Sequence, residues 1–267
     1  MESNVRYTLR HAALMGLAAV TAATAQPPAG APVAPPRTAR AAAPIDLAGW
    51  WVAVVTEDWR WRMVTPLRGD FANIPATPAA YAVGAAWDPA KDEAAGELCK
   101  AYGAPAILRR PGRLQITWAD DHTLKIATDE GTQTRLLHFG AEAPATEQPS
   151  LQGWSAARWE GAMTGVAPPE AFSIGTQSRA GAQGRALEVS TTRLKPGYLR
   201  TNGIPFGANV ELTEYFNTFK EPNGTEWFVV TTVVRDPEFL VGPWVTTSNF
   251  KREPDGSKFQ PTPCSVR

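Results

Sequence analysis

Along most of this chain, apolar and polar side chains alternate with the two-residue period of β-strands. The longest such stretch covers residues 47–65 and reads LAGWWVAVVTEDWRWRMVT. Its first half is apolar on both faces, whereas its second half has one tryptophan-rich face and one charged face. We expect these residues to form one long strand that opens an antiparallel barrel and supplies part of a ligand site.

Eight further stretches show strand patterns and follow one another along the chain. They cover residues 113–118, 124–128, 132–139, 154–159, 187–194, 208–219, 227–235 and 244–252. Turn residues such as Asn223-Gly224 separate several neighbours, which is typical of hairpins. The pattern predicts a mainly all-β fold, an antiparallel up-and-down barrel of about nine strands, because closing the sheet leaves no strand edge unpaired.

Between the opening strand and the strand at residues 113–118, the apolar period becomes that of helices. Thr77 precedes Pro78, and Asp88 precedes Pro89, so each pair places a capping residue before a proline at the first helical position. Gly103 ends the second helical stretch. The sequence predicts a helical insertion at about residues 77–103 that plugs or covers one end of the barrel.

The N-terminal residues have the pattern of an export signal. Arg6 and Arg10 precede an apolar run of small residues, and Ala23-Thr24-Ala25 provides a cleavage site. The apolar run is too short to span a bilayer. Residues 1–25 are therefore expected to be a signal peptide, cleaved near Ala25, which directs the protein to the periplasm or out of the cell.

The next stretch separates the signal from the barrel. Residues 26–45 are rich in proline and alanine and have no apolar period, which predicts a disordered linker. A single barrel domain is then expected over residues 46–267.

The charges argue against two classes of partner. Lys and Arg number 26, as do Asp and Glu, and removal of residues 1–25 leaves 24 basic and 25 acidic side chains, a net charge of −1. Such a chain has no basic field to attract nucleic acid or an anionic membrane. We expect neither partner and no membrane span; the sequence does not define the oligomeric state.

The expected export gives meaning to the two cysteines. Cys99 and Cys264 form an even pair in an oxidising compartment, which predicts a disulfide bond. The bond would tie the last turn of the helical insertion to the C-terminal tail. In the chain-entropy model, a loop of this length contributes up to about 5 kcal/mol to stability.

Familiar catalytic and metal motifs are missing from the sequence. The histidines His11, His122 and His138 have no ligand spacing, and neither cysteine has a nearby partner thiol. No phosphate-binding loop, dinucleotide fingerprint or nucleophile elbow occurs. We therefore expect no metal ion and no cofactor.

The second half of the opening stretch supplies most of the candidate site. A two-residue period divides it into the faces Glu57, Trp59, Trp61 and Asp58, Arg60, Arg62. If the first face lines the lumen, its glutamate has a raised pKa and serves as a general acid or base. If the second does, its arginines suit an anionic or polyhydroxy ligand. A purely structural reading, with tryptophans inside and arginines outside, stays open.

Later parts of the chain add four candidates. Glu214 lies on a mostly apolar strand face, so a role in acid–base catalysis and a salt bridge to an arginine in the lumen are both open. Tyr215, on the opposite face, is a candidate ligand contact. Tyr198 and Arg200 lie in a loop rich in turn residues, where the binding groups of a barrel mouth are often found. Their alternative is a hydrogen-bonded turn.

Two resemblances add to this reading. Gly49-Trp50-Trp51 resembles the G-x-W signature of lipocalins, in which the tryptophan plugs the closed end of the barrel and an arginine near the end of the last strand stacks on it. Trp51 matches the tryptophan, and Arg252 is a candidate for the arginine. The helical insertion departs from the lipocalin pattern, in which the helix follows the barrel.

The mature chain also resembles a group of exported proteobacterial proteins. The matching stretches are TEDWRWRMVTP, WDPAKDEAAGE, GTQTRLLHF, LKPGYLRTNGIPF and FKREPDGSKFQPTPC. This resemblance implies an exported, lipocalin-like barrel and carries no activity with it.

Three functional hypotheses follow. The first is that the exported barrel binds a small, partly aromatic or apolar molecule in its lumen. The second is a cofactor-free lyase, isomerase or hydratase in which Glu57 or Glu214 moves a proton and arginine stabilises negative charge. The third is an envelope protein that binds another protein through the helical insertion. Turnover abolished by Glu57→Gln or Glu214→Gln distinguishes the second, and a partner lost on deletion of residues 77–103 distinguishes the third.

Overall fold

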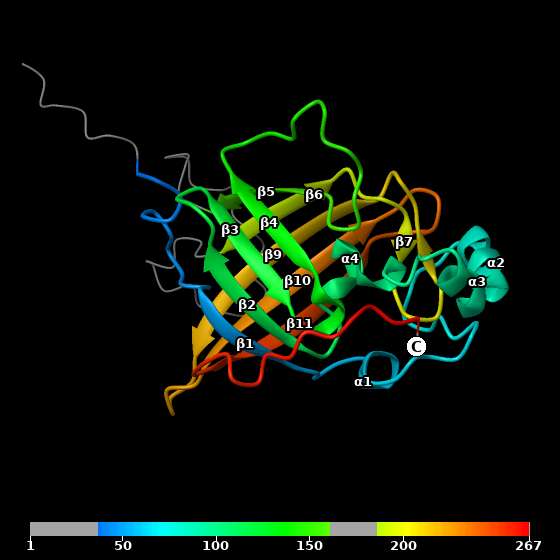
Figure 1. Cartoon of the computed structure of the whole chain (residues 1–267), viewed down its shortest axis with the longest axis horizontal. Coiled ribbons are helices and arrows are strands. Elements are labelled where there is room, and N and C mark those ends of the chain that lie inside the picture. Colours follow the sequence, from blue (N-terminus) through cyan, green and yellow to red (C-terminus); the bar gives the residue numbers. More distant parts are fainter. Residues whose placement is uncertain (1–36, 161–185, 267) are drawn as a thin grey trace, which may run out of the picture. The chain divides into compact units, whose positions relative to one another are not determined.

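Nine strands pair edge to edge into a closed barrel in the part of the chain that the computed structural model describes, residues 37–160 and 186–266 (Figure 1). In order around the barrel they are β1 (Gly49–Val54), β2 (Arg113–Trp118), β3 (Thr123–Thr128), β4 (Thr134–Phe139), β5 (Trp154–Trp159), β6 (Leu187–Thr192), β9 (Glu211–Lys220), β10 (Glu226–Arg235) and β11 (Trp244–Glu253). β11 pairs with β1 and closes the ring. The predicted all-β barrel is confirmed.

One neighbouring pair departs from the predicted antiparallel order. β4 and β5 run parallel, with Leu137 opposite Ser155, while all other neighbours in the barrel are antiparallel. An odd number of strands cannot alternate in direction all the way around a closed ring, so one parallel pair is required. Residues 140–153 carry the chain back to the end of the barrel at which β4 began.

The prediction of a long opening strand over residues 47–65 is wrong in its second half. β1 ends at Val54, and residues Trp59–Arg62 form one helical turn, α1. Between them, Asp58 adopts a left-handed conformation with φ of 52°, which short polar side chains tolerate. Its carboxylate accepts hydrogen bonds from Arg109 at 2.7 Å and from Asn73 at 3.2 Å, and these contacts fix the turn. The division into two strand faces therefore does not apply beyond Val54.

The helical insertion is present at one end of the barrel, on the right of Figure 1. It consists of α2 (Pro78–Ala86), α3 (Pro89–Ala94), η1 (Lys100–Tyr102) and α4 (Ala104–Ile107). Thr77 and Asp88 cap α2 and α3 by accepting hydrogen bonds from backbone N–H groups, as predicted. α3 ends sooner than expected, because Gly96 takes a positive φ of 70°. The short strands β7 (Gly197–Tyr198) and β8 (Pro205–Phe206) pair in a separate small sheet near the insertion.

Aromatic side chains fill the interior of the barrel away from the insertion. Phe228 stacks on Phe250 at 4.5 Å between ring centres and meets Trp51 edge-on at 4.7 Å. The guanidinium of Arg252 lies 4.2 Å from the centre of the Trp51 ring. This local geometry is the one that the lipocalin resemblance implies for these two residues, while membership of that family stays a prediction.

A second apolar cluster packs between the insertion, β8 and the near ends of β9, β10 and β11. Its buried members include Phe71, Ala80, Phe206, Val234 and Trp244. Between the two clusters lies a layer of polar side chains that point into the barrel from consecutive strands. These are Arg135, Ser155, Thr191, Glu214, Thr232, Thr246 and Ser248. Two apolar clusters and a set of buried polar side chains thus make up the described core.

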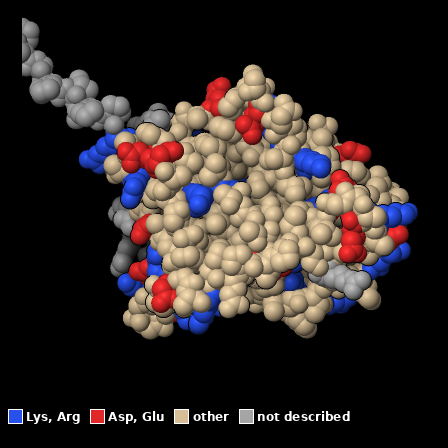
Figure 2. Space-filling view, viewed as in Figure 1, with Lys and Arg blue, Asp and Glu red and all other residues tan. Residues whose placement is uncertain are grey.

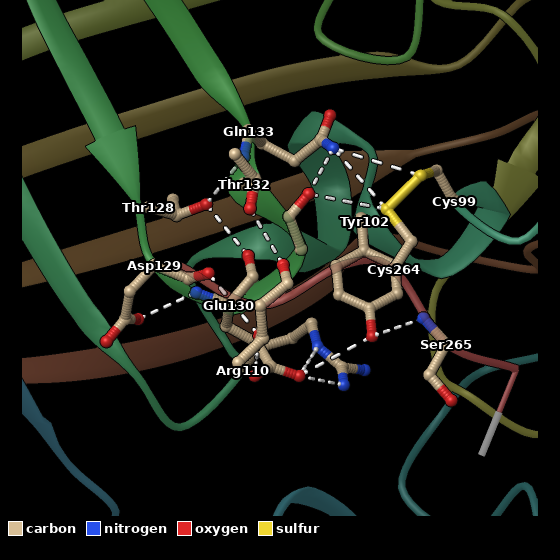
Figure 3. Close-up of polar contacts among 12 residues, drawn as sticks. Cys99, Tyr102, Arg110, Thr128, Asp129, Glu130, Thr132, Gln133, Cys264 and Ser265 are labelled. Carbon is tan, nitrogen blue, oxygen red and sulfur yellow. Dashed lines mark hydrogen bonds and ion pairs between the residues drawn. A yellow bond between two sulfur atoms is a disulfide. The ribbon is translucent and has the colours of Figure 1, made fainter. Parts of the chain in front are cut away.

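The predicted disulfide is present and fastens the C-terminal tail. Cys99 is bonded to Cys264, 165 residues further along the chain. Beside it, the backbone N–H of Thr262 donates to the carbonyl of Asp129 at 2.8 Å. The backbone N–H of Ser265 donates to the Tyr102 hydroxyl at 3.0 Å (Figure 3). Asp129 adjoins η2 (Glu130–Thr132), the short helical turn between β3 and β4. The tail thus joins the insertion to this turn.

The predicted signal peptide and residues 26–36 of the linker lie outside the described residues. Residues 37–45, the remainder of that linker, pack on the barrel. Ile45 is buried, and the Trp159 indole donates to the carbonyl of Ala39 at 2.9 Å. The backbone N–H of Arg40 donates to the carbonyl of Asp121 at 3.0 Å. No helix in the described part of the chain is long and apolar enough to cross a bilayer.

Candidate functional site

A pocket lies where α1, the helical insertion and the loop between β7 and β8 meet. Its cavity volume is about 30 Å³. The lining residues are Trp61, Arg62, Ala101, Ala106, Arg109, Arg110, Leu199, Arg200 and Thr201. We call this the arginine pocket, because four of its nine lining residues are arginines contributed by three separate segments.

Three of these arginines are buried, which is unusual for the residue type. Arg62 is 9% exposed, and Arg109 and Arg200 are each 6% exposed. Arg109 is well paired, because it donates to Asp58 at 2.7 Å and to Glu57 at 3.3 Å. The other two have no carboxylate partner among the described residues.

The N–H groups of Arg62 and Arg200 are largely unsatisfied. Arg62 donates through Nε to the backbone carbonyl of Arg109 at 2.7 Å, while its two terminal nitrogens have no hydrogen-bond partner in the described part of the chain. All three guanidinium nitrogens of Arg200 are buried in the same unpartnered state. A buried donor without an acceptor costs about 1–3 kcal/mol, so such groups call for a reason.

Burial also changes the acidity of both groups. Desolvation lowers the pKa of Arg62 to about 10; the charge of Arg109 adds to this effect, and the charges of Glu57 and Asp58 oppose it. Burial likewise lowers the pKa of Arg200 to about 10, against the opposing charge of Asp58. Both groups remain cationic near neutral pH, in a place where a cation is poorly solvated.

Aromatic rings hold the guanidinium groups in place. The Arg200 guanidinium lies 5.0 Å from the centre of the Trp61 ring and 5.9 Å from that of Trp244, and Arg109 lies 5.1 Å from Trp244. A ring offers no hydrogen-bond acceptor of the usual kind, so these contacts leave the three guanidinium nitrogens of Arg200 without a partner. The arrangement therefore positions the donors without satisfying them.

The charges around the pocket do not balance. Among the described residues, Glu57 and Asp58 are the carboxylates that offset Arg62, Arg109 and Arg200. Asp70 also acts on Arg200 but is already paired with Arg60, so one positive charge is left over. Two neighbouring ion pairs, Arg60–Asp70 at 2.7 Å and Arg110–Glu130 at 2.6 Å, are each neutral. The excess is local, since Figure 2 shows Lys and Arg interspersed with Asp and Glu on the face that it presents.

The structure brings together six of the predicted site residues. They are Glu57, Asp58, Arg60, Trp61, Arg62 and Arg200. Trp59 belongs to the same helical turn but is 69% exposed and does not line the pocket. The six residues come together because the chain turns at Asp58, and not because they share one face of a strand.

Tyr198 lies near this group and has a different partner. Its hydroxyl donates to the Asp92 carboxylate at 2.9 Å, and the same carboxylate accepts from Lys100 at 3.0 Å and from the Trp87 indole at 2.8 Å. Burial and the contact with Asp92 raise the pKa of Tyr198 to about 12. This cluster fastens the helical insertion to β7, and a role of Tyr198 in ligand binding stays a prediction.

The two candidates on β9 lie away from the pocket. Glu214 is fully buried inside the barrel and forms a two-pronged ion pair with Arg135 at 2.7 and 3.1 Å. The salt-bridge alternative for Glu214 is thus present, and its catalytic role stays a prediction. Tyr215 lies half-buried on the outer face of the strand. Neither contacts the lining of the arginine pocket.

Sequence reasoning missed Arg109 and Trp244. The signal for Arg109 is the pair Arg109-Arg110 directly after the buried apolar turn α4. Trp244 has the strand alternation that points it into the barrel, but only the tertiary structure places it against Arg109 and Arg200.

The comparisons with known proteins add no family and no relative. No protein-family model, curated protein or solved structure matches this chain. The described residues also contain no group of three or more His, Cys, Asp or Glu side chains placed to hold a metal ion. The functional argument therefore depends on the fold and on the arginine pocket.

Proposed function

We propose that this protein is an exported small-molecule-binding barrel whose ligand docks by an acceptor group in the arginine pocket. The observation that carries the proposal is the pair of buried guanidinium groups, Arg62 and Arg200, whose N–H groups have no partner among the described residues. A ligand acceptor would satisfy these donors and solvate the excess charge. The disulfide fits an oxidising compartment.

The surroundings of the pocket support a ligand with an apolar or aromatic part. Trp61 and Leu199 line the pocket, and Trp59 in α1 and Met63 and Val64 directly after it are all more than half exposed. Such side chains offer contact area to a ligand body that the small cavity does not hold. We propose that the ligand binds at this end of the barrel and not deep in the lumen, because the unpartnered arginines lie here and the lumen is lined by an apolar cluster.

Arg200→Met is expected to weaken ligand binding while stabilising the free protein. The variant removes three unsatisfied donors and keeps most of the side-chain volume, so the free energy of unfolding should rise by about 1–3 kcal/mol. Ligand affinity should fall by about tenfold to a hundredfold, as for a lost charge-assisted hydrogen bond. Thermal unfolding and titration calorimetry with a panel of small organic acids, alcohols and amides measure the two effects.

Arg158→Met is the matched control, because Arg158 is exposed, paired with Glu188 and outside the pocket lining. It should change both quantities little. An Arg200→Met protein that is less stable than the wild type and binds equally well would show that Arg200 is a structural group, and the proposal would fail.

The pocket also predicts an alkaline limit to binding. The pKa of Arg62 and Arg200 is lowered to about 10, so the free site loses its charge as the pH rises through that value. Affinity for an acceptor ligand should be flat near neutral pH and fall as the pH rises through about 10. Deprotonation also removes the cost of burying these cations. As the pH rises through about 10, the free energy of unfolding of the free protein should therefore increase relative to that of Arg200→Met. Unfolding and binding curves from about pH 8 to about pH 11 test both signs.

A further inference from the structure

We infer that the group bound by the arginine pocket is a single monoanionic oxyanion of the carboxylate class, and that Glu57 and Asp58 set this charge preference. The inference rests on the proposed function and names the ligand chemistry of the same site.

The free donors line one small cavity and are of the kind that a carboxylate accepts from. Arg62 is held at Nε by the carbonyl of Arg109, so its two terminal nitrogens are the ones available. Arg200 has an entire free edge, Nε together with its terminal nitrogens. Paired N–H groups on a planar fork match the two oxygens of a carboxylate, and each oxygen can accept from both arginines.

The number of charges favours a monoanion. Arg109 is neutralised by Asp58, and Glu57 is fixed beside it by the backbone N–H of Thr247, which donates at 2.7 Å. With both carboxylates in place, the cluster carries one positive charge in excess. A monoanion would leave it neutral, whereas a dianion would leave an uncompensated buried negative charge and a neutral molecule an uncompensated positive one.

The size of the cavity limits what can enter. Sites for complete drug-sized ligands usually enclose about 300–1,000 Å³. The arginine pocket, with about 30 Å³, has room for one small polar group. The carboxylate is therefore expected to insert, while the body of the ligand stays at the mouth near Trp61 and the exposed side chains of α1 and the residues after it.

Glu57 is the residue at which the charge preference can be changed. Glu57→Gln adds one positive charge to the cluster, and the glutamine oxygen still accepts from the N–H of Thr247, so the turn should keep its structure. The altered site should then favour a dianion. The side chain of Glu57 is 37% exposed and glutamine has nearly the same size, so the substitution should not disturb the packing of the core.

The test uses three probes that share a phenyl ring: benzoate as the monoanion, phenylphosphonate as the dianion at mildly alkaline pH, and benzyl alcohol as the neutral molecule. Calorimetric titration of the wild type should give benzoate an affinity at least about tenfold above the other two. In Glu57→Gln, the affinity for phenylphosphonate should rise by about tenfold or more relative to that for benzoate. Glu188→Gln, a carboxylate removed from an outer ion pair with Arg158, is the control for net charge and should leave the order unchanged.

The outcomes separate the inference from the proposed function. If the three probes bind the wild type with equal affinity and Arg200→Met weakens that binding, the pocket is a ligand site but the monoanion preference is wrong. The same conclusion follows if Glu57→Gln leaves the order of affinities unchanged. If no probe binds, or if binding is indifferent to Arg200→Met, the proposed function itself fails.

Discussion

Arg135→Met is expected to lower the free energy of unfolding by about 3–5 kcal/mol, because it leaves the Glu214 carboxylate buried without its partner. Both side chains are only 1% exposed, and Arg135 donates to both oxygens of Glu214, so no solvent is available to replace it. Ser155 and Thr191 also lose a donor, although they keep their mutual hydrogen bond of 2.8 Å. Urea unfolding followed by circular dichroism measures the loss.

Two matched variants test the reason for this loss. Arg158→Met breaks an ion pair with Glu188 in which the arginine is 71% exposed, and should cost less than about 1 kcal/mol. The double variant Arg135→Met/Glu214→Leu removes both buried charges and should recover most of the stability. A single variant as stable as the wild type, or a double variant no better than the single one, would contradict the view that the buried pair is an interdependent unit.

Loss of the disulfide is expected to cost about 2–5 kcal/mol, because the bond closes a loop of 165 residues in the unfolded chain. The double variant Cys99→Ser/Cys264→Ser should show this loss and should also weaken ligand binding. Cys99 adjoins η1, and the tail residue Ser265 donates to the hydroxyl of Tyr102 in that helix (Figure 3). The Tyr102 ring in turn lies 4.1 Å from the guanidinium of Arg110, which lines the pocket.

Unfolding midpoints with and without reductant measure the contribution of the bond. The wild type should fall to the midpoint of the serine variant on reduction, and the variant itself should not respond to reductant. Equal midpoints for oxidised wild type, reduced wild type and variant would mean that the hydrogen bonds of the tail, such as that from Thr262 to Asp129, suffice without the covalent link.

Local chemistry made most of the strands predictable. β2, β9, β10 and β11 alternate between buried and exposed side chains, and turn residues such as Asn223-Gly224 mark where the chain reverses. The helical caps at Thr77 and Asp88 are equally local, since each side chain bonds a backbone N–H only two or three residues away. The parallel pairing of β4 with β5 has no local sequence signal. It is required because the closed barrel has an odd number of strands, which is a property of the whole ring.

The opening stretch shows where local reasoning fails. Residues 59–62 alternate between tryptophan and arginine, which favours a strand, yet the chain turns at Asp58 and these residues form a helical turn. The partner that stabilises the turn is Arg109, 51 residues away. Arg62 and Arg200 were identifiable as arginines near aromatic residues, but their lack of partners is a property of the folded chain. The residue types at the site are thus readable from the sequence, and their pairing is not.

The most direct test of the arginine pocket as a ligand site is a crystal structure of the protein soaked with para-bromobenzoate, read from the anomalous signal of the bromine. The account predicts the carboxylate within hydrogen-bond distance of Arg62 and Arg200, with the ring and bromine directed towards Trp61 and the mouth of the pocket. A fully occupied bromine elsewhere on the protein, with the guanidinium groups of Arg62 and Arg200 still without an acceptor, would contradict it.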